Sequence, residues 1–393
     1  MADVALLDSD ASPPSGPLAG LLVADFSRVL AGPYATMLLG DLGATVVKVE
    51  GPSGDDTRHW QPPTAERPEG PEATYYLAIN RNKHSVVLDL KDPEDKALAQ
   101  SLANRADVVI ENFMTGTTAK FGLDEPTVRA ANPGVVYCSI TGFGDRGGAK
   151  LGGYDLLVQA TSGLMSLTGA PDGQPYRAGV AVFDVMTGLH SAVAILAALR
   201  HREATGEGQY VKTNLLSSAL SSLVNQTSAF VAGGFVPGRM GNAHLSLFPY
   251  EPLPTGDGEL IVIAANDHQF RRLCGAIDAP ELLEDERFAT QLDRTRNREE
   301  LRPHLLERLS CRGAQEWFDI LSAAGVPCGP INTVDQGIDL AASLGLEPVV
   351  HPGGGVGTVR NPVEYSVTPP DYRRTPPPLG ADTETVKKWL RDV

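Results

Sequence analysis

From residue 18 to about residue 213, short apolar runs alternate with stretches in which apolar residues recur every three or four positions. The short runs predict strands, and the periodic stretches predict helices. The predicted strands include 45–50, 107–113 and 134–141. The predicted helices include 28–44, 91–106 and 123–132. This alternation is typical of an α/β fold with a doubly wound parallel sheet.

The pattern changes after residue 215. Residues 247–265 form two alternating runs around a Gly-Asp-Gly turn, which predicts an antiparallel hairpin. A helix is predicted at 297–310, where Asn297 and Glu300 have the spacing of a capping box. The chain therefore divides into a tail expected to be disordered, a large α/β domain, a small α+β domain and a turn-rich end that finishes in an amphipathic helix, at 1–17, 18–224, 225–332 and 333–393.

One helix has an acidic residue where it is predicted to begin. The residues from Thr187 to His201 are largely apolar, so we expect this helix to be buried on more than one side, with Asp184 just before it. An aspartate at that place is most often a helix N-cap. It also suits a nucleophile, because the amides of a helix N-terminus would keep a carboxylate ionised and stabilise an oxyanion beside it.

Composition excludes several functions. The net charge is −15 and the isoelectric point is near 5.0, which argues against a nucleic-acid or anionic-membrane partner. The four cysteines lack paired spacing and the eight histidines are dispersed, so we expect neither a disulfide framework nor a metal site. No apolar run spans a bilayer, and the acidic N-terminus does not resemble a signal peptide. These features predict a cytoplasmic protein.

Short motifs name no reaction. Residues 142–147 spell GFGDRG, which matches a dinucleotide fingerprint, but loop residues follow where a helix should begin, so we interpret 142–153 as a mobile loop over a ligand. The basic stretch 80–83 lies at a predicted sheet end, where it is either a solvated turn or a phosphate contact. Arg58 and Trp60 lie on a long Pro/Gly-rich loop that is a candidate for ligand binding. Together these features indicate an α/β enzyme with an anionic ligand.

Longer blocks resemble the family III CoA-transferases. The blocks are DFSRVLAGPYATMLLGDLGATVVKVE, GDDTRHW, NRNKHSVVLDLK, ADVVIENF, YCSITGFG, the Asp184 segment and VPCGPIN, in this order along the chain. Within the family the chain looks closest to succinyl-CoA:glutarate CoA-transferases. The resemblance implies a Rossmann-like large domain built from both chain ends, a smaller domain, and two ring-shaped subunits that interlock as a homodimer.

The resemblance also assigns residues. Asp184 would be the nucleophile that forms a covalent CoA thioester, and no tightly bound cofactor would be needed beside the acyl-CoA and carboxylic acid substrates. Residues expected along the CoA path are Val29, Leu30, Lys83, Asn112, Phe113, Lys120 and Phe121. Residues expected near the acyl group are Trp60, Tyr75 and Phe143, and candidates for the far carboxylate of a diacid are Arg28, Arg58, Arg239 and His244.

Two departures from related enzymes bear on the reaction. Racemases of this superfamily carry a histidine where this chain has Tyr154, and a tyrosine with an ordinary pKa near 10 is a poor base at neutral pH. The triple-glycine loop of formyl-CoA transferases is absent at 239–246. A CoA-transferase with a dicarboxylate acceptor is the first hypothesis. A 2-methylacyl-CoA racemase, a CoA-binding protein without turnover and a dehydrogenase are the alternatives.

Overall fold

The computed structural model describes residue 7 and residues 15–392, which form two compact units. The first unit contains the chain up to residue 164, residues 177–235 and the chain from residue 347. The second contains residues 165–176 and 236–346. Most of the tail predicted at 1–17 lies outside the described residues, although Leu7 is buried and Ser15 donates to the carboxylate of Asp371.

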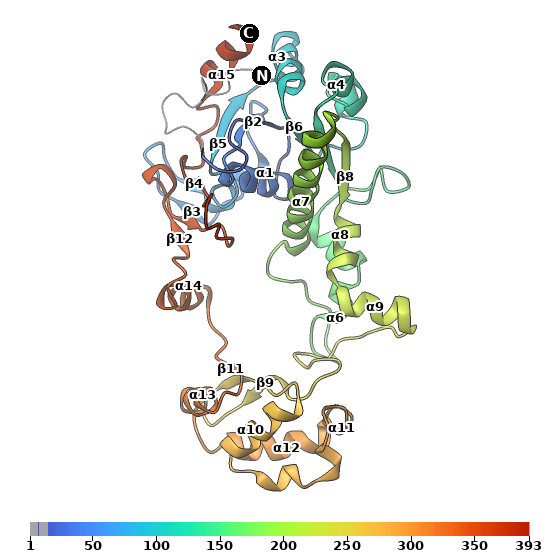
Figure 1. Ribbon diagram of the computed structural model, residues 1–393, viewed down its shortest axis with the longest axis vertical. Helices are drawn as coiled ribbons and strands as arrows, with labels where there is room; N and C mark the ends of the chain where they lie inside the picture. Colours follow the sequence, from blue (N-terminus) through green and yellow to red (C-terminus); the bar gives the residue numbers. More distant parts are fainter. Residues whose placement is uncertain (1–6, 8–14, 393) are drawn as a thin grey trace. The chain divides into compact units, whose positions relative to one another are not determined.

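A parallel six-stranded sheet forms the centre of the first unit (Figure 1). Its order is β5-β2-β1-β6-β7-β8, and every neighbouring pair is parallel. The strands are β1 (Leu22–Asp25), β2 (Thr45–Glu50), β5 (Lys83–Val87), β6 (Val108–Glu111), β7 (Val136–Thr141) and β8 (Tyr210–Asn214). The predicted α/β fold with a parallel sheet is confirmed.

Helices cover both faces of this sheet because successive strand residues point to opposite sides. Val108 and Ile110 belong to one hydrophobic core, while Val109 between them belongs to the other. The first core packs beneath α1 (Ala31–Asp41), α5 (Asp155–Thr161), α7 (Val182–Thr205) and α8 (Leu215–Ser222). The second packs beneath α3 (Pro93–Arg105), α4 (Glu125–Ala131) and α15 (Thr383–Asp392). The shorter helical segments of this unit include η2 (Asp56–His59), α2 (Thr74–Leu77), η3 (Thr118–Phe121), α9 (Val224–Gly233) and η6 (Pro352–Gly354).

The helix that carries Asp184 differs from the prediction in two ways. It begins at Val182, so Asp184 lies inside its first turn and the N-cap is Ala181, which makes the N-cap interpretation wrong. It is also buried on one side only, since Val193 is 66% exposed. Among the described helices, α7 alone is long and apolar enough to cross a bilayer, but Ile195 and Leu199 pack into the core of the first unit.

The second unit is a small α+β structure around a three-stranded sheet, β11-β10-β9. Strands β9 (Tyr250–Pro254) and β10 (Glu259–Ile263) form the predicted antiparallel hairpin, and β11 (Cys328–Gly329) joins them. Its longer helices are α10 (Asp267–Ala276), α11 (Gln291–Arg296), α12 (Arg298–Leu309), α13 (Ala314–Ala323) and α14 (Val334–Ser343). The predicted capping box of α12 is wrong: Asn297 makes no side-chain cap, and its side-chain Nδ2 instead donates to the carbonyl of Arg287.

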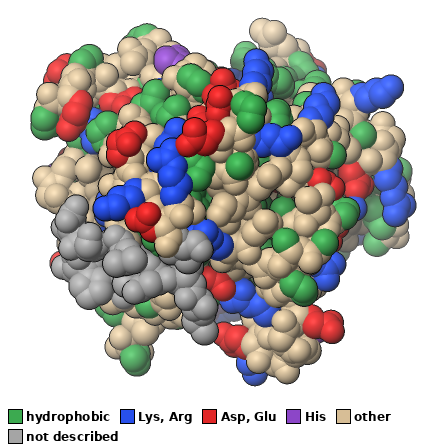
Figure 2. Space-filling model, turned by 90° about the horizontal axis from the view of Figure 1, so that it is seen from above, with side chains coloured by type: hydrophobic (Ala, Val, Ile, Leu, Met, Phe, Trp, Pro, Cys, Tyr) green, Lys and Arg blue, Asp and Glu red, His purple; other side chains and the backbone are tan. Residues whose placement is uncertain are grey.

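The surface of the molecule carries both charge signs. Figure 2 shows Lys and Arg side chains interspersed with Asp and Glu on one face. This mixture accords with the acidic composition, which has 48 Asp and Glu against 33 Lys and Arg.

Candidate active site

A cavity of about 830 Å³ opens in the first unit, at the carboxyl ends of the parallel strands, where α/β sheets bind their ligands. Its walls come from five stretches of chain, at 28–31, 56–60, 112–115, 140–156 and 177–184, with Tyr75 and Leu215. The Gly-rich loop 142–153 contributes much of this lining, and its residues 144–150 form turns rather than a helix. Asp184 lines the cavity from the first turn of α7.

The carboxyl group of Asp184 is held in an unusual electrostatic setting. Burial, and then the negative charge of Asp155, raise its pKa from 3.8 to about 7. Within the described part of the chain, no hydrogen bond or ion pair to this carboxylate is found. Burial and the charge of Asp155 therefore oppose the ionisation of Asp184 that was expected from the helix N-terminus.

The first-turn amides of α7 already have acceptors. Those of Phe183 and Asp184 donate to Oδ1 of Asp155, at 2.7 Å and 3.2 Å. The amide of Val182 donates to the Val180 carbonyl, and that of Val185 donates to the Ala181 carbonyl. The oxyanion role expected for these amides is therefore not available in this arrangement. The sequence pointed to Asp184 but missed Asp155, although Asp155 directly follows Tyr154, which occupies the position of the racemase histidine.

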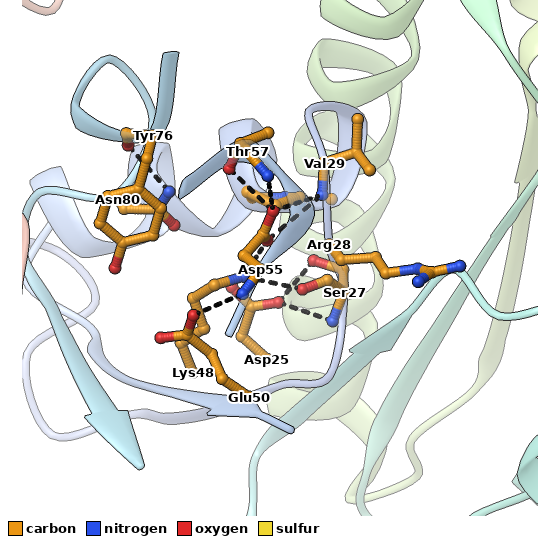
Figure 3. Close-up of polar contacts among 12 residues, drawn as sticks. Asp25, Ser27, Arg28, Val29, Lys48, Glu50, Asp55, Thr57, Tyr76 and Asn80 are labelled. Carbon is orange, nitrogen blue, oxygen red and sulfur yellow. Dashed lines mark hydrogen bonds and ion pairs between the residues drawn. The ribbon is translucent and has the colours of Figure 1, made fainter. Parts of the chain in front are cut away.

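The turn at 27–30 forms another wall of the cavity and is held from two sides. The amide of Arg28 donates to Asn112 Oδ1 at 3.0 Å, and Asn112 Nδ2 donates to the Arg28 carbonyl at 2.7 Å. The amide of Val29 donates to the carboxylate of Asp55, and Val29 has a φ of +70° (Figure 3). A β-branched residue is strained at positive φ, so these bonds compensate for a costly backbone conformation.

Buried ion pairs and hydrogen bonds hold the turn at 27–30 in place. Lys48 donates to Asp55 at 2.8 Å and to the carbonyl of Ser27 at 2.9 Å (Figure 3). Although burial acts to raise the pKa of Asp55, the charge and hydrogen bond of Lys48 lower it to about 2. Asp25 accepts from Ser27 Oγ and from Lys83 Nζ, the latter at 3.2 Å. The position of the turn therefore depends on charges that solvent does not reach.

Two residues predicted to contact ligand belong to this buried network. Lys83 is fully buried, donates to Asp25, Asn80 and the Pro33 carbonyl, and has a pKa that burial lowers to about 8. Arg58 is 6% exposed and pairs with Glu50 at 2.8 Å. Neither lines the cavity. Both cations are already neutralised, so their contacts favour a structural role.

The rest of the predicted phosphate stretch 80–83 is buried as well. Arg81 pairs with Asp41 at 2.6 Å, and Asn82 Nδ2 donates to the same carboxylate at 2.9 Å. The stretch was interpreted as either a solvated turn or a phosphate contact, and the structure shows neither. It joins β5 to α1 through a carboxylate that lies 40 residues earlier in the chain.

Several predicted ligand residues do line the cavity. They are Arg28, Val29, Leu30, Trp60, Tyr75, Asn112 and Phe113, together with Asp184. Trp60 and Tyr75 pack edge to face, with ring centroids 5.0 Å apart. Burial, and then the charge of Asp184, raise the pKa of Tyr75 to about 12, so its hydroxyl stays protonated at neutral pH.

The other predicted ligand residues lie outside this lining. Lys120 is exposed on η3, and Phe121 packs against the core beneath α3. Phe143 packs against the core beneath α7, between two lining glycines. Arg239 and His244 belong to the second unit, where Arg239 donates to the carbonyls of Ala170 and Gly173 and His244 Nδ1 accepts from the Ser246 amide.

The cavity also contains a residue that the sequence did not suggest. Arg177 lines it, is exposed, and forms no ion pair within the described residues. Arg28, the other lining arginine, pairs with Asp56 at 3.2 Å. No cluster of His, Cys, Asp and Glu able to hold a metal occurs in the described ranges.

Comparisons identify the class of enzyme that this fold and cavity define. The model of CoA-transferase family III matches residues 18–383, so the chain belongs to this family and is a CoA-transferase. The chain is 43% identical to the succinate–glutarate CoA-transferase of Agrobacterium fabrum, over 95% of this chain and 97% of that protein.

Two further relatives agree with this assignment. The chain is 40% identical to the human succinyl-CoA:glutarate CoA-transferase, over 95% of this chain and 85% of that protein. The crystal structure of a CAIB/BAIF family protein from Brucella suis has a TM-score of 0.86 and 40% identity, and covers 96% of this chain and all of its own.

Proposed function

We propose that this enzyme transfers CoA from succinyl-CoA to a short dicarboxylic acid such as glutarate, with Asp184 as the nucleophile. The observation that carries the proposal is a half-buried carboxylate without a cationic partner among the described residues, on the wall of a cavity large enough for an acyl chain. The names of the relatives from Agrobacterium fabrum and human support the choice of succinyl-CoA and glutarate.

The reaction follows from the chemistry of a carboxylate facing a thioester. The ionised Asp184 attacks the succinyl carbonyl, the carbon–sulfur bond breaks, and a mixed anhydride and CoA thiolate form. The thiolate then attacks the aspartyl carbonyl, which releases succinate and leaves an aspartyl-CoA thioester. Glutarate attacks this thioester, and the same two steps run in reverse to give glutaryl-CoA and free Asp184. No net proton transfer is required.

We assign the distal carboxylate of the diacid to the arginines of the cavity. Arg177 is exposed in the lining without an ion pair among the described residues, whereas Arg28 must share its charge with Asp56. A charge-assisted bond to the far carboxylate would favour a diacid over a monoacid. Arg177→Ala is expected to raise the KM for glutarate about tenfold or more, and Arg177→Lys less, while the KM for butyrate stays unchanged. Equal effects on both acids would remove Arg177 from this role.

The turn at 27–30 and the adjoining Asn112 and Phe113 are proposed to bind CoA. Support comes from their shared place in the lining and from the backbone clamp between Arg28 and Asn112. Lys120, exposed on η3 a few residues further along, is a candidate for an outer contact with the nucleotide end of CoA.

We further propose that the enzyme is a cytoplasmic homodimer. Exposed apolar residues occur on α7 and α9, including Val193 at 66% and Val231 at 83%, and such surfaces are often covered by another subunit. Four cysteines without a disulfide among them accord with a reducing compartment. Sedimentation of the purified protein tests the dimer, and a monomer at micromolar concentration would contradict it.

The function is tested by acceptor survey. The enzyme is incubated with succinyl-CoA and, separately, glutarate, other short diacids and matched monoacids, and new acyl-CoA species are followed by mass spectrometry. Asp184→Asn is the test variant, and Asp56→Asn, which also alters a cavity carboxylate, is its matched control. Glutaryl-CoA formed by wild type and Asp56→Asn but not by Asp184→Asn supports the proposal. Absence of exchange with every acid, or inversion of a 2-methylacyl-CoA in its place, would overturn it.

A further inference from the structure

A buried pair of side chains connects α5 to the chain that leads into α7. Asp155 is 9% exposed and Gln159 is fully buried, one helical turn apart. Gln159 Nε2 donates to Asp155 Oδ2 at 2.5 Å and to the Val180 carbonyl at 3.2 Å. Gln159 Oε1 accepts from the amide of Ala178 at 2.8 Å. We call Asp155 and Gln159 the α5 brace.

The brace holds both ends of one short segment. At its start, Gln159 fixes Ala178, next to the cavity arginine Arg177. At its end, Asp155 Oδ1 accepts from the amides of Phe183 and Asp184. Asp155 therefore acts as the N-terminal acceptor of α7 although it lies 29 residues before Asp184. The brace therefore holds the backbone at both ends of the segment from Ala178 to Asp184.

We propose that Asp155 is a positioning residue: its bonds to the amides of Phe183 and Asp184 fix the Asp184 carboxyl in the first turn of α7, with a second carboxylate in the same cavity wall. The proposal rests on the function given above only in taking Asp184 as the nucleophile. Two observations carry it: the paired amide bonds, which set where Asp184 lies, and the position of both carboxylates in one cavity wall. The raised pKa of Asp184 supports it.

Other polar groups around α7 could affect the same titration. Those on packed elements are Tyr34 on α1, Tyr75 on α2, His190 on α7 itself and the brace on α5, and those in the cavity lining are Arg28, Asp56, His59, Tyr154 and Arg177. Tyr34 and Tyr75 have raised pKa values, chiefly through burial, and are neutral near pH 7. His190 Nδ1 pairs with Ser218 Oγ. After burial, Asp155 is the neighbour that raises the pKa of Asp184.

A more basic nucleophile has a chemical consequence. A carboxylate with a higher pKa is a stronger nucleophile once ionised, but a smaller fraction is ionised at a given pH below that pKa. Asp155 would thus give Asp184 greater reactivity above pH 7 and leave it mostly protonated at pH 6. When Asp184 ionises, its proton passes to solvent, since the cavity is open.

The test measures the titration of Asp184 directly. Carbodiimide with an amine converts protonated carboxyl groups to amides, and peptide mass mapping reads the extent at Asp184 between pH 5 and 9 in the enzyme without substrate. Asp155→Asn is expected to lower the midpoint by about one pH unit, a tenfold loss of proton affinity. Asp155→Ser, which also removes the charge and places no second amide donor against Gln159 Nε2, is expected to act in the same direction.

Gln159→Met is the matched control, because it breaks the brace but keeps the charge of Asp155. The midpoint of the Asp184 titration in Gln159→Met is expected to equal that of wild type even if the transfer activity of this variant falls. A midpoint unchanged in both Asp155 variants, with native circular dichroism, would overturn the proposal, as would an equal shift in Gln159→Met. The titration is measured without turnover, so its result does not depend on the proposed function. A wild-type enzyme that transfers no CoA would contradict the proposed function, whereas a lower midpoint in the Asp155 variants would still support the effect of Asp155 on the titration of Asp184.

Discussion

Replacing Asp184 with asparagine is expected to stabilise the folded protein, and more so at high pH. The folded chain holds the proton of Asp184 up to about pH 7, whereas the unfolded chain releases it near 3.8. Between these values the folded state binds more protons than the unfolded state, so the contribution of Asp184 to stability falls as pH rises. Below pH 3.8 that contribution is fully present, and above pH 7 it is lost. Asparagine carries no such penalty.

The size of the effect follows from the same values. A pKa raised from 3.8 to about 7 corresponds to at most about 4 kcal/mol above pH 7. The carboxyl group lines an open cavity and is only partly buried, so solvent screening reduces this to on the order of 1–2 kcal/mol. The gain of Asp184→Asn over wild type should therefore be small at pH 4.5 and about 1–2 kcal/mol at pH 8.

Urea unfolding of wild type and Asp184→Asn at pH 4.5, 6 and 8 measures this difference. Asp339→Asn, at an exposed position on α14, serves as the control for a change of net charge. A gain that is constant with pH, or that shrinks as pH rises, would refute the assignment of a raised pKa to Asp184. The expected result would also show that the buried Asp184 carboxyl lowers the stability of the folded protein in exchange for reactivity.

Three further results are expected. The kcat/KM for transfer from succinyl-CoA should rise about tenfold from pH 5 to pH 6 and level off above pH 7, as Asp184 ionises, and a profile flat from pH 5 to 8 would contradict this. Arg58→Met should lower the free energy of unfolding by about 3–5 kcal/mol, because it leaves the buried Glu50 without its ion-pair partner. Adding Glu50→Gln to this variant should restore part of the lost stability. A loss below about 1 kcal/mol in Arg58→Met would refute a structural role for Arg58. Gly188→Val should destabilise the protein by about 1–3 kcal/mol, since its Cβ would lie 2.7 Å from the Ala31 carbonyl oxygen. Gly337→Ala, on α14 where a Cβ would meet no neighbouring atom, should stabilise the protein by about 0.5–1 kcal/mol. Equal effects of the two variants on urea unfolding would contradict the close contact between α1 and α7.

Much of the fold could be predicted from local pattern. Strands β2, β6 and β7 are rich in Val, Ile and Thr, which is typical of strands in a parallel sheet covered on both faces. The hairpin of β9 and β10 was marked by its turn. The start of α7 was missed because its first-turn amides donate to Asp155. This residue lies far earlier in the chain, so no local pattern marks it as the acceptor.

The site was harder to predict than the fold. Lys83 and Arg58 are charged residues in loop-like sequence, and nothing local shows that Asp25 and Glu50 neutralise them inside the protein. Asp184 could be found from its place near the start of a predicted helix and from family resemblance, yet its raised pKa depends on burial and on a carboxylate brought close by folding. Arg177 lies in a stretch without regular structure and became visible only through the cavity.

The central claim is that Asp184 carries CoA during transfer. The direct measurement is mass mapping of enzyme mixed with succinyl-CoA and quenched in acid before an acceptor is added, with hydroxylamine treatment of a second sample. We predict CoA attached to the peptide that contains Asp184 and, after hydroxylamine, a hydroxamate at that residue, with neither in Asp184→Asn. An unmodified Asp184 in an enzyme that nevertheless forms glutaryl-CoA would contradict the account.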